Sequence, residues 1–274
     1  MPWDNQSMTP HFMFPCSPLD SRMIDEPFQD QAIALKQAGF GTSCFSLEDN
    51  RITGAVPEGV TIVYRGWMMT EAEYAFFYGW LRGKNLTPLT TIPQYATTHY
   101  LPNWYAIVED RWGVGNLTPR TEIITGDELA GRAEAIVAAY KWPKFQVKDF
   151  VKSLKTAGGS VHTDPKQIKT IMEEMEKYRG VIEGGLCLRE WEDYYPNSEK
   201  RYFILGGKFY GQDVSFDVRA MEILQRLARD IPSPFFSADI AERIDGRFRV
   251  VELGDGQVSD LVGWTDQRFT EIWK

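Results

Sequence analysis

Cysteine and histidine are scarce in this chain of 274 residues, which contains three of each. Cys16, Cys44 and Cys187 are odd in number and widely spaced, so they predict neither a disulfide framework nor a paired-cysteine zinc site. Cys44 and Cys187 lie in apolar runs and are expected in the core. No serine or cysteine nucleophile motif accompanies a histidine, which argues against nucleophilic catalysis.

Long apolar runs and an excess of positive charge are also missing. No run of about 18 apolar residues exists, and the N-terminus lacks the basic and apolar regions of a secretion signal. We therefore expect a reduced, soluble, cytoplasmic protein that does not act at a membrane. Thirty basic against 38 acidic side chains give a net charge of -8, so a broad surface for nucleic acid is not predicted. A local phosphate pocket is compatible with this charge.

The first part of the chain predicts an open α/β layer. Residues 41–47 and 60–64 have the composition of strands, and residues 29–39 that of a helix. A second helix over 70–83 begins at the N-cap Thr70, has Glu73 at the capping-box position and ends at a glycine. Strands that alternate with helices favour a parallel sheet.

The second part predicts an α+β arrangement of mainly antiparallel strands. Strands are expected over 144–151, 181–191, 201–205 and 208–214, and helices over 127–141, 164–178 and 217–230. The glycines and proline between 112 and 120 are the best candidate boundary. We therefore predict an N-terminal domain over 1–118 and a second domain over 119–274, the latter divided into subdomains near residue 195.

Residues 237–255 contain the most informative pattern, two strands around a turn at residues 244–247. Asp239 lies in the first strand and Glu252 in the second, and such positions can face each other in a hairpin. Magnesium is commonly held by one or two carboxylates together with nucleotide phosphates, so a magnesium–nucleotide site is one interpretation. A solvated hairpin with surface acids is the alternative, and these residues alone favour neither.

Several cations and one loop could meet phosphate. Lys148 stands mid-strand between apolar neighbours, where burial costs free energy unless an anion pairs with it, although an edge-strand lysine facing water is the commoner outcome. Lys144 is a weaker candidate because exposed lysines are common. Gly158 and Gly159 lie in a loop whose N–H groups could cradle phosphate oxygens, or in an ordinary turn.

Two further candidates are an acidic segment at the end of a strand and an arginine that follows it in the sequence. The exit L-C-L-R-E-W-E-D-Y over 186–194 could pair with an adenine edge and, through Glu192 or Asp193, with ribose hydroxyls. Trp191 could equally be a core or rim aromatic. Arg201 opens a strand and could direct its guanidinium at a terminal phosphate or carboxylate, although a surface arginine is more frequent.

Taken in chain order, these features resemble the ATP-grasp fold, in the branch related to ribosomal-protein glutamate ligases (RimK-like). The motifs that carry the resemblance are V-K-D-F-V-K-S, L-R-E-W-E-D-Y and V-V-E-L-G-D-G-Q-V-S, within residues 121–261. The first hundred residues more loosely resemble the Rossmann-like α/β domain that precedes the grasp. The expected fold class is thus α/β plus α+β, with a nucleotide held between two subdomains.

The resemblance implies a carboxylate–amine ligase that uses ATP and magnesium and forms an acyl phosphate. It implies roles for the candidates residue by residue: phosphate contacts from Lys148, a nucleotide pocket that includes Lys144, Glu190, Trp191, Glu192, Gly158 and Gly159, catalysis by Arg201 with Lys148, and magnesium ligation by Asp239 and Glu252. The family usually has an asparagine two residues after the metal glutamate. Here Gly254 occupies that place, and Asp255 is the candidate substitute ligand.

The substrates are not specified by these motifs. Small-molecule or peptide carboxylates and amines are expected, with Arg65, at the end of a predicted strand, and Arg189 as candidate substrate contacts. The polar-aromatic run over 97–105 is a further candidate for a pocket wall, although core aromatics are the commoner outcome for most of its residues. Two other classes remain open: a nucleotide-binding module without ligase activity, and a phosphotransferase.

Overall fold

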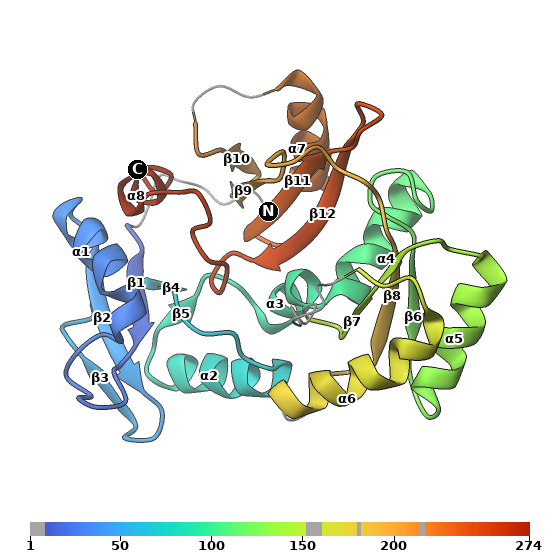
Figure 1. Cartoon of the computed structure of the whole chain (residues 1–274). Helices are drawn as coiled ribbons and strands as arrows, with labels where there is room; N and C mark the ends of the chain where they lie inside the picture. The colour runs from blue at the N-terminus through green and yellow to red at the C-terminus, as the bar shows by residue number, and fades with distance from the viewer. Residues whose placement is uncertain (1–8, 152–160, 180–181, 214–216) are drawn as a thin grey trace. The chain divides into compact units, whose positions relative to one another are not determined.

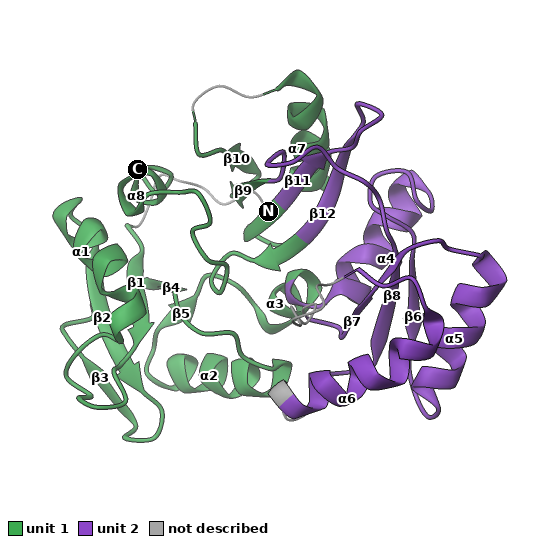
Figure 2. Cartoon of the chain, in the orientation of Figure 1, with its two compact units in different colours: residues 1–98, 200–238, 253–274 green, residues 99–199, 239–252 purple. Residues whose placement is uncertain are grey.

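The computed structural model describes residues 9–151, 161–179, 182–213 and 217–274. The chain divides into two compact units, which Figure 2 distinguishes by colour: unit 1 comprises residues 1–98, 200–238 and 253–274, and unit 2 comprises residues 99–199 and 239–252. This division differs from the domains predicted at 118/119 and near 195, which stay a prediction.

Unit 1 begins with alternating strands and helices (Figure 1). In chain order these are β1 (His11–Pro15), the 3₁₀ turn η1 (Glu26–Phe28), α1 (Gln29–Gln37), β2 (Gly41–Ser46), β3 (Arg51–Thr53), β4 (Thr61–Tyr64), α2 (Glu71–Gly83), β5 (Thr87–Pro88) and α3 (Ile92–His99). The later segments of unit 1 add β9 (Lys200–Leu205), β10 (Lys208–Tyr210), α7 (Val218–Asp230) and α8 (Asp266–Glu271).

The five-stranded sheet of unit 1 has the order β3-β2-β1-β4-β5. β1 pairs in parallel with β2 and β4, and β4 with β5, whereas β3 is antiparallel to β2. Parallel neighbours need a crossover connection, which α1 provides between β1 and β2 and α2 provides between β4 and β5. The predicted parallel α/β layer is therefore confirmed.

Alternation along the strands builds a core on each face of this sheet. Phe12 and Phe14 of β1 pack in one cluster with Leu35 of α1, while Met13 packs in another with Phe77 of α2. The capping box of α2 is present: Thr70 Oγ1 accepts from the Glu73 N–H at 3.2 Å, and Glu73 Oε2 accepts from the Thr70 N–H at 2.7 Å.

A four-stranded sheet has the order β10-β9-β11-β12, in which β11 is Phe235–Glu242 and β12 is Phe248–Asp255. The predicted turn between the last two strands is confirmed. Within it, the Gly246 N–H donates to Arg243 O and the Arg243 N–H donates to Arg247 O, both at 2.8 Å. Gly246 has a φ of 83°, a left-handed conformation that glycine adopts without steric cost.

Unit 2 is built on a three-stranded antiparallel sheet of order β6-β8-β7. Its elements are α4 (Leu101–Trp112), β6 (Thr121–Ile124), α5 (Leu129–Tyr140), β7 (Phe145–Lys148), η2 (Pro165–Gln167), α6 (Ile168–Arg179) and β8 (Leu186–Glu190). One face packs Phe145 and Val147 against α5 and α6, through Val137 and Met175. Gln146, Lys148 and Arg189 belong to the opposite face because side chains alternate along a strand.

The polar-aromatic run over 97–105 forms helices rather than an open pocket wall. It spans the end of α3 and the first turns of α4, where Pro102 occupies the first helical turn that suits proline. Trp104 and Tyr105 are buried. None of the helices among the described residues is long and apolar enough to cross a membrane.

Candidate active site

Lys148 and Glu252 meet within unit 2, although 104 positions separate them in the sequence. Lys148 Nζ lies 3.4 Å from Glu252 Oε2, and the two side chains are 5% and 33% exposed. Removing an ammonium group from water is costly unless an anion compensates it, and here a carboxylate does so. The predicted phosphate-binding cation and the predicted metal ligand therefore share one location.

Asp239 lies on β11, next to the strand that contains Glu252. It is buried, with 7% of its surface exposed. In the described ranges of the chain, no three His, Cys, Asp or Glu side chains gather as a potential metal site. Two carboxylates nevertheless suit magnesium, which usually completes its octahedron with phosphate oxygens and water.

A cavity of about 350 Å³ lies within unit 2. Its wall includes all three predicted adenine and ribose residues, Glu190, Trp191 and Glu192, together with Gln146 of β7 and Val251 of β12. Gln146 and Lys148 are two positions apart on one face of β7, and Val251 precedes Glu252. The strands that line this cavity thus also present the Lys148–Glu252 ion pair.

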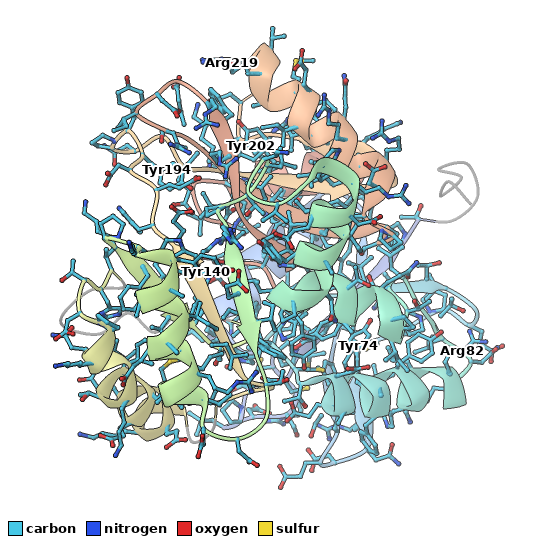
Figure 3. All side chains as sticks on the ribbon, turned by 90° about the vertical axis from the view of Figure 1, so that its right-hand side faces the viewer. Tyr74, Arg82, Tyr140, Tyr194, Tyr202 and Arg219 are labelled. Atoms are coloured by element: carbon cyan, nitrogen blue, oxygen red, sulfur yellow. The ribbon has the colours of Figure 1, made fainter. Side chains whose placement is uncertain are left out.

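The aromatic segment after β8 forms another part of the cavity wall. Tyr194, labelled in Figure 3, and Tyr195 line the cavity with Asn197 and Ser198. The Tyr195 N–H donates to Glu242 O at 2.9 Å, which fixes this segment to the end of β11. Burial raises the pKa of Tyr194, helped by the neighbouring Glu192 carboxylate, so its phenol stays protonated at neutral pH.

Glu192 is held by protein donors on both of its oxygens. Arg249 donates to Oε1 at 2.8 Å and to Oε2 at 2.9 Å, Arg243 donates to Oε1 at 3.0 Å, and the Tyr194 hydroxyl donates to Oε2 at 2.9 Å. Each carboxylate oxygen thereby has two donors, which fills its lone pairs. Glu192 remains a wall residue, but these contacts favour an anchoring role over acceptance from ribose.

Arg249 is the residue that sequence reasoning missed. It is 1% exposed, and besides Glu192 its guanidinium binds the carbonyl oxygens of Gly115 and Asn116. A cation between Phe248 and Val250 carries the same signal that singled out Lys148, namely charge in the middle of an apolar strand. Gln146, a residue of the cavity wall that sequence reasoning also missed, has no such signal because polar residues are common on a half-exposed strand.

Lys144 and Trp191 lie together at the exit of β8. Lys144 Nζ contacts Asp193 Oδ1 at 3.2 Å, and the Trp191 indole N–H donates to the same oxygen at 2.9 Å. The indole and then the lysine lower the pKa of Asp193 by hydrogen bonding. The Lys144–Asp193 pair is about half exposed on both sides, so it contributes little to stability.

Arg189 is buried and holds parts of unit 2 together. Its guanidinium binds Val251 O and Thr118 Oγ1, and lies 5.8 Å from the centre of the Trp104 ring. Among the described residues, its Nε–H has no hydrogen-bond partner. Arg189 also forms part of the cavity wall, so an anchoring role and a contact with a bound molecule are compatible.

Arg65, the other predicted substrate contact, is buried within unit 1. Its guanidinium donates to Gln31 Oε1 at 2.9 Å, to Ser259 O at 2.9 Å and to Gly256 O. It also lies 4.7 Å from the centre of the Phe269 ring. Because these partners occupy both ends and the Nε of the guanidinium, Arg65 anchors the loop after β12 rather than facing a substrate.

Asp255, the candidate substitute metal ligand, is fully buried in unit 1. Its Oδ1 accepts from the Gln257 backbone N–H at 3.0 Å and from Gln257 Nε2 at 3.1 Å, and its Oδ2 accepts from the Thr98 hydroxyl at 3.3 Å. Burial raises its pKa to about 7, against the lowering effect of these bonds. Gln257 is thus a direct neighbour of this carboxyl, through both its backbone and its side chain.

The remaining predicted residues are distributed as follows. Arg201 is the second residue of β9 in unit 1, where its Nη1 donates to Asp260 O at 2.9 Å. Gly158 and Gly159 lie outside the described residues. Their predicted role in a phosphate-binding loop stays a prediction.

Comparison with known families identifies the family of this chain. The model of an ATP-grasp domain family, the third family of a RimK-related clade, matches residues 121–272, more than half of the chain. The chain belongs to this ATP-grasp family. The resemblance to the RimK-like branch of the superfamily is thus confirmed. No curated protein matches the sequence.

Solved ATP-grasp structures share the fold of this ATP-grasp family member at low sequence identity. A RimK-domain ATP-grasp protein from Sphaerobacter thermophilus has a TM-score of 0.63 and 12% identity, covering 96% of each chain. The D-cycloserine synthetase DcsG has a TM-score of 0.61 and 15% identity, covering 96% of this chain and 99% of its own. The ligase PsnB, in complex with a phosphomimetic variant of its minimal precursor, Mg and ADP, has a TM-score of 0.56 and 12% identity, covering 98% and 97%.

Proposed function

We propose that this ATP-grasp protein is a magnesium-dependent ligase that uses ATP to join a carboxylate to an amine through an acyl phosphate. The observation that carries the proposal is the Lys148–Glu252 pair, a buried cation and a half-buried carboxylate 3.4 Å apart. A buried lysine needs an anion, and a nucleotide phosphate would meet that need when Glu252 turns to a metal ion.

The residues present fit a magnesium ion bound with a nucleotide. Asp239 and Glu252 supply two hard oxygen ligands from neighbouring strands, and phosphate oxygens would supply more. Bound magnesium would neutralise charge on the phosphates. Asp255 as a third ligand is part of the proposal, and it would have to exchange its hydrogen bonds with Gln257 and Thr98 for the metal.

The cavity in unit 2 is the proposed nucleotide pocket. Its volume of about 350 Å³ lies at the lower end of the range for small-molecule sites. Trp191 and Tyr195 offer aromatic faces, while Glu190 and Gln146 offer polar groups that could select the base. Lys148 lies on the same face of β7 as Gln146, where it would contact phosphates beyond the base and ribose.

The proposed reaction proceeds in two steps. A substrate carboxylate oxygen attacks the terminal phosphorus of ATP, which releases ADP and leaves an acyl phosphate. An amine nitrogen then attacks the acyl carbon, which expels phosphate while the nitrogen loses a proton. Lys148 and Arg201 would stabilise phosphate charge in both steps, so the protein contributes mainly orientation and electrostatics.

The substrates are proposed only as classes. PsnB was solved with a peptide precursor, and DcsG is named as the synthetase of a small molecule, so both peptide and small-molecule carboxylates and amines are candidates. The five-stranded sheet of unit 1 is proposed to belong to a Rossmann-like domain that precedes the grasp and helps to select them. A cytoplasmic location is part of the same proposal.

A turnover assay over a panel of carboxylates and amines tests the proposal. We expect ADP and phosphate in equal amounts and an amide product by mass spectrometry, both dependent on magnesium. ATP binding without turnover for any pair would instead indicate a nucleotide-binding module. ADP with a phosphorylated product would indicate a phosphotransferase.

Two variants with matched controls test the site itself. Lys148→Met should weaken ATP binding at least about tenfold in calorimetry, because one phosphate contact with a buried cation is worth more than about 1.4 kcal/mol. Lys169→Met, at an exposed position of α6, should leave it unchanged. Glu252→Gln should abolish magnesium-dependent turnover and lower the melting temperature, because it leaves the buried Lys148 ammonium without its carboxylate. The exposed control Glu173→Gln should change neither turnover nor melting temperature. Unchanged ATP affinity in Lys148→Met would remove Lys148 from the site.

A further inference from the structure

Two cysteine thiols are in direct contact in unit 1. Cys16 Sγ lies 2.8 Å from Cys44 Sγ, although 28 positions separate the residues in sequence. Both are free cysteines, as is Cys187. The third cysteine lies in β8 of unit 2, so it does not belong to this pair.

Strand register explains why these two residues meet. β1 and β2 pair in parallel with a constant register, in which Phe14 lies opposite Cys44 and Pro15 opposite Phe45. Cys16 follows β1 directly, and it shares a face of the sheet with Phe14 because side chains alternate. Cys16 and Cys44 are therefore diagonal neighbours on one face. The Cys16 N–H donates to Phe45 O at 2.9 Å, which keeps the end of β1 against β2.

The two sulfur atoms differ in their access to solvent. Cys44 is 2% exposed, whereas Cys16 is only half-buried, so a small oxidant reaches the pair through Cys16. The two sulfur atoms of a disulfide bond lie about 2.05 Å apart. The present separation of 2.8 Å is longer than this by less than one bond length. Cys16 lies just beyond the last residue of β1 and forms an isolated antiparallel bridge with Ile24.

We propose that Cys16 and Cys44 form an oxidation site, a dithiol that a hydroperoxide converts to an intramolecular disulfide. The Cys16 thiolate attacks a peroxide oxygen and becomes a sulfenic acid, with release of water or an alcohol. The Cys44 sulfur then attacks the Cys16 sulfur and releases water, with loss of the Cys44 proton. Two thiols lose two electrons in total, and the peroxide accepts them.

The environment of the thiols sets the pH dependence of this reaction. Burial, and then the hydrogen bond with Cys44, raise the pKa of Cys16 to about 12. The Cys16 thiol is therefore protonated at neutral pH, and its reactive thiolate is a small fraction. The oxidation rate should rise about tenfold for each pH unit between about pH 7 and pH 9, because the thiolate fraction rises by that factor.

Thiol counting on the whole chain tests the proposal. The protein is treated with hydrogen peroxide at about pH 8.5, denatured, alkylated with N-ethylmaleimide and weighed by mass spectrometry. The reduced chain should take three alkyl groups, one for each cysteine in the sequence. The oxidised monomer should take one, mapped to Cys187, and peptide mapping should find Cys16 linked to Cys44. Dithiothreitol should restore all three.

Variants separate this site from other thiol chemistry. Cys187→Ser should form the same disulfide at the same rate and take no alkyl group after oxidation. Cys16→Ser should form no intramolecular disulfide, and its Cys44 should still be alkylated. The proposal is overturned if the wild-type chain still takes three alkyl groups after oxidation, if the disulfide bond involves Cys187, or if the disulfide-bonded species are dimers. The experiment uses no nucleotide, so its result does not depend on the proposed ligase function.

Discussion

Asp255→Asn should change how the stability of this protein depends on pH. Asp255 is fully buried, and its pKa rises from 3.8 to about 7 in the folded state. The folded protein thus keeps a proton on Asp255 that the unfolded chain releases near pH 4. Unfolding releases this proton in the window between these pKa values, so the contribution of Asp255 to stability is lost as the pH rises through that window.

The size of the effect follows from the width of the window. A difference of roughly three pH units between the folded and unfolded pKa of Asp255 corresponds to about 4 kcal/mol of unfolding free energy. About 2 kcal/mol of this change falls between pH 5 and pH 6.5. Asparagine cannot ionise, and it keeps the shape of the side chain. Its oxygen can still accept from Gln257, and the Thr98 hydroxyl can reverse its role to accept from the new amide.

Urea unfolding between about pH 5 and pH 8 measures this contribution. EDTA is included and nucleotide left out, so that no metal ion competes for the carboxylate. The free energy of unfolding of Asp255→Asn minus that of the wild type should grow by about 2 kcal/mol between pH 5 and pH 6.5 and level off above about pH 7.5. Other titrating groups, such as the buried His11, cancel in this difference.

A matched control shows whether the effect belongs to this carboxyl. Asp110→Asn changes an acid in α4 whose side chain is 79% exposed. The difference between its free energy of unfolding and that of the wild type should not change with pH. A flat difference for Asp255→Asn as well would contradict the explanation, because it would mean that this carboxyl ionises equally in the folded and unfolded states.

Three further predictions concern the residues that hold the fold and the cavity wall. Arg249→Met leaves Glu192 buried without its main partner and should lower the free energy of unfolding, measured with urea, by about 3–5 kcal/mol. The double variant Arg249→Met with Glu192→Leu should recover most of this loss. Equal destabilisation by the single and double variants would contradict the pairing. Thr70→Ala removes the capping bond of α2 and should cost about 1 kcal/mol in the same assay, and Thr70→Ser almost none. Arg65→Met removes three hydrogen bonds to buried acceptors and should cost several kcal/mol, roughly 1–3 for each acceptor left unpaired, without a change in substrate preference; a changed preference with normal stability would restore Arg65 as a substrate contact.

Local sequence patterns predicted local structure well. The box of Thr70 and Glu73, the turn at Gly246 and the strand after α1 depend on neighbours within a few residues, and all are present. For the run over 97–105 the sequence left both a pocket wall and core aromatics open, because a polar-aromatic composition does not distinguish them; α4 buries Trp104 and Tyr105.

The roles of single charged residues were harder to predict. Arg65 and Arg189 have the sequence context of ligand contacts, yet each is held by carbonyl oxygens from distant segments. Glu192 has the sequence context of a ribose acceptor, but Arg249, 57 positions away in the sequence, donates hydrogen bonds to its carboxylate. The availability of a charged group depends on these partners, and partners so far apart in sequence leave no local signal.

The ATP-grasp family of this chain, the capped helix, the final hairpin and the kinds of residue needed for magnesium and phosphate all follow from the sequence. Short motifs suffice for them, because periodicity, turn chemistry and residue type act over a few positions. The contacts of Lys148 with Glu252, of Arg249 with Glu192 and of Cys16 with Cys44 emerge only in the folded chain. Such pairs are selected by strand register and by the free-energy cost of burying an unpaired charge, and both arise when distant segments pack together.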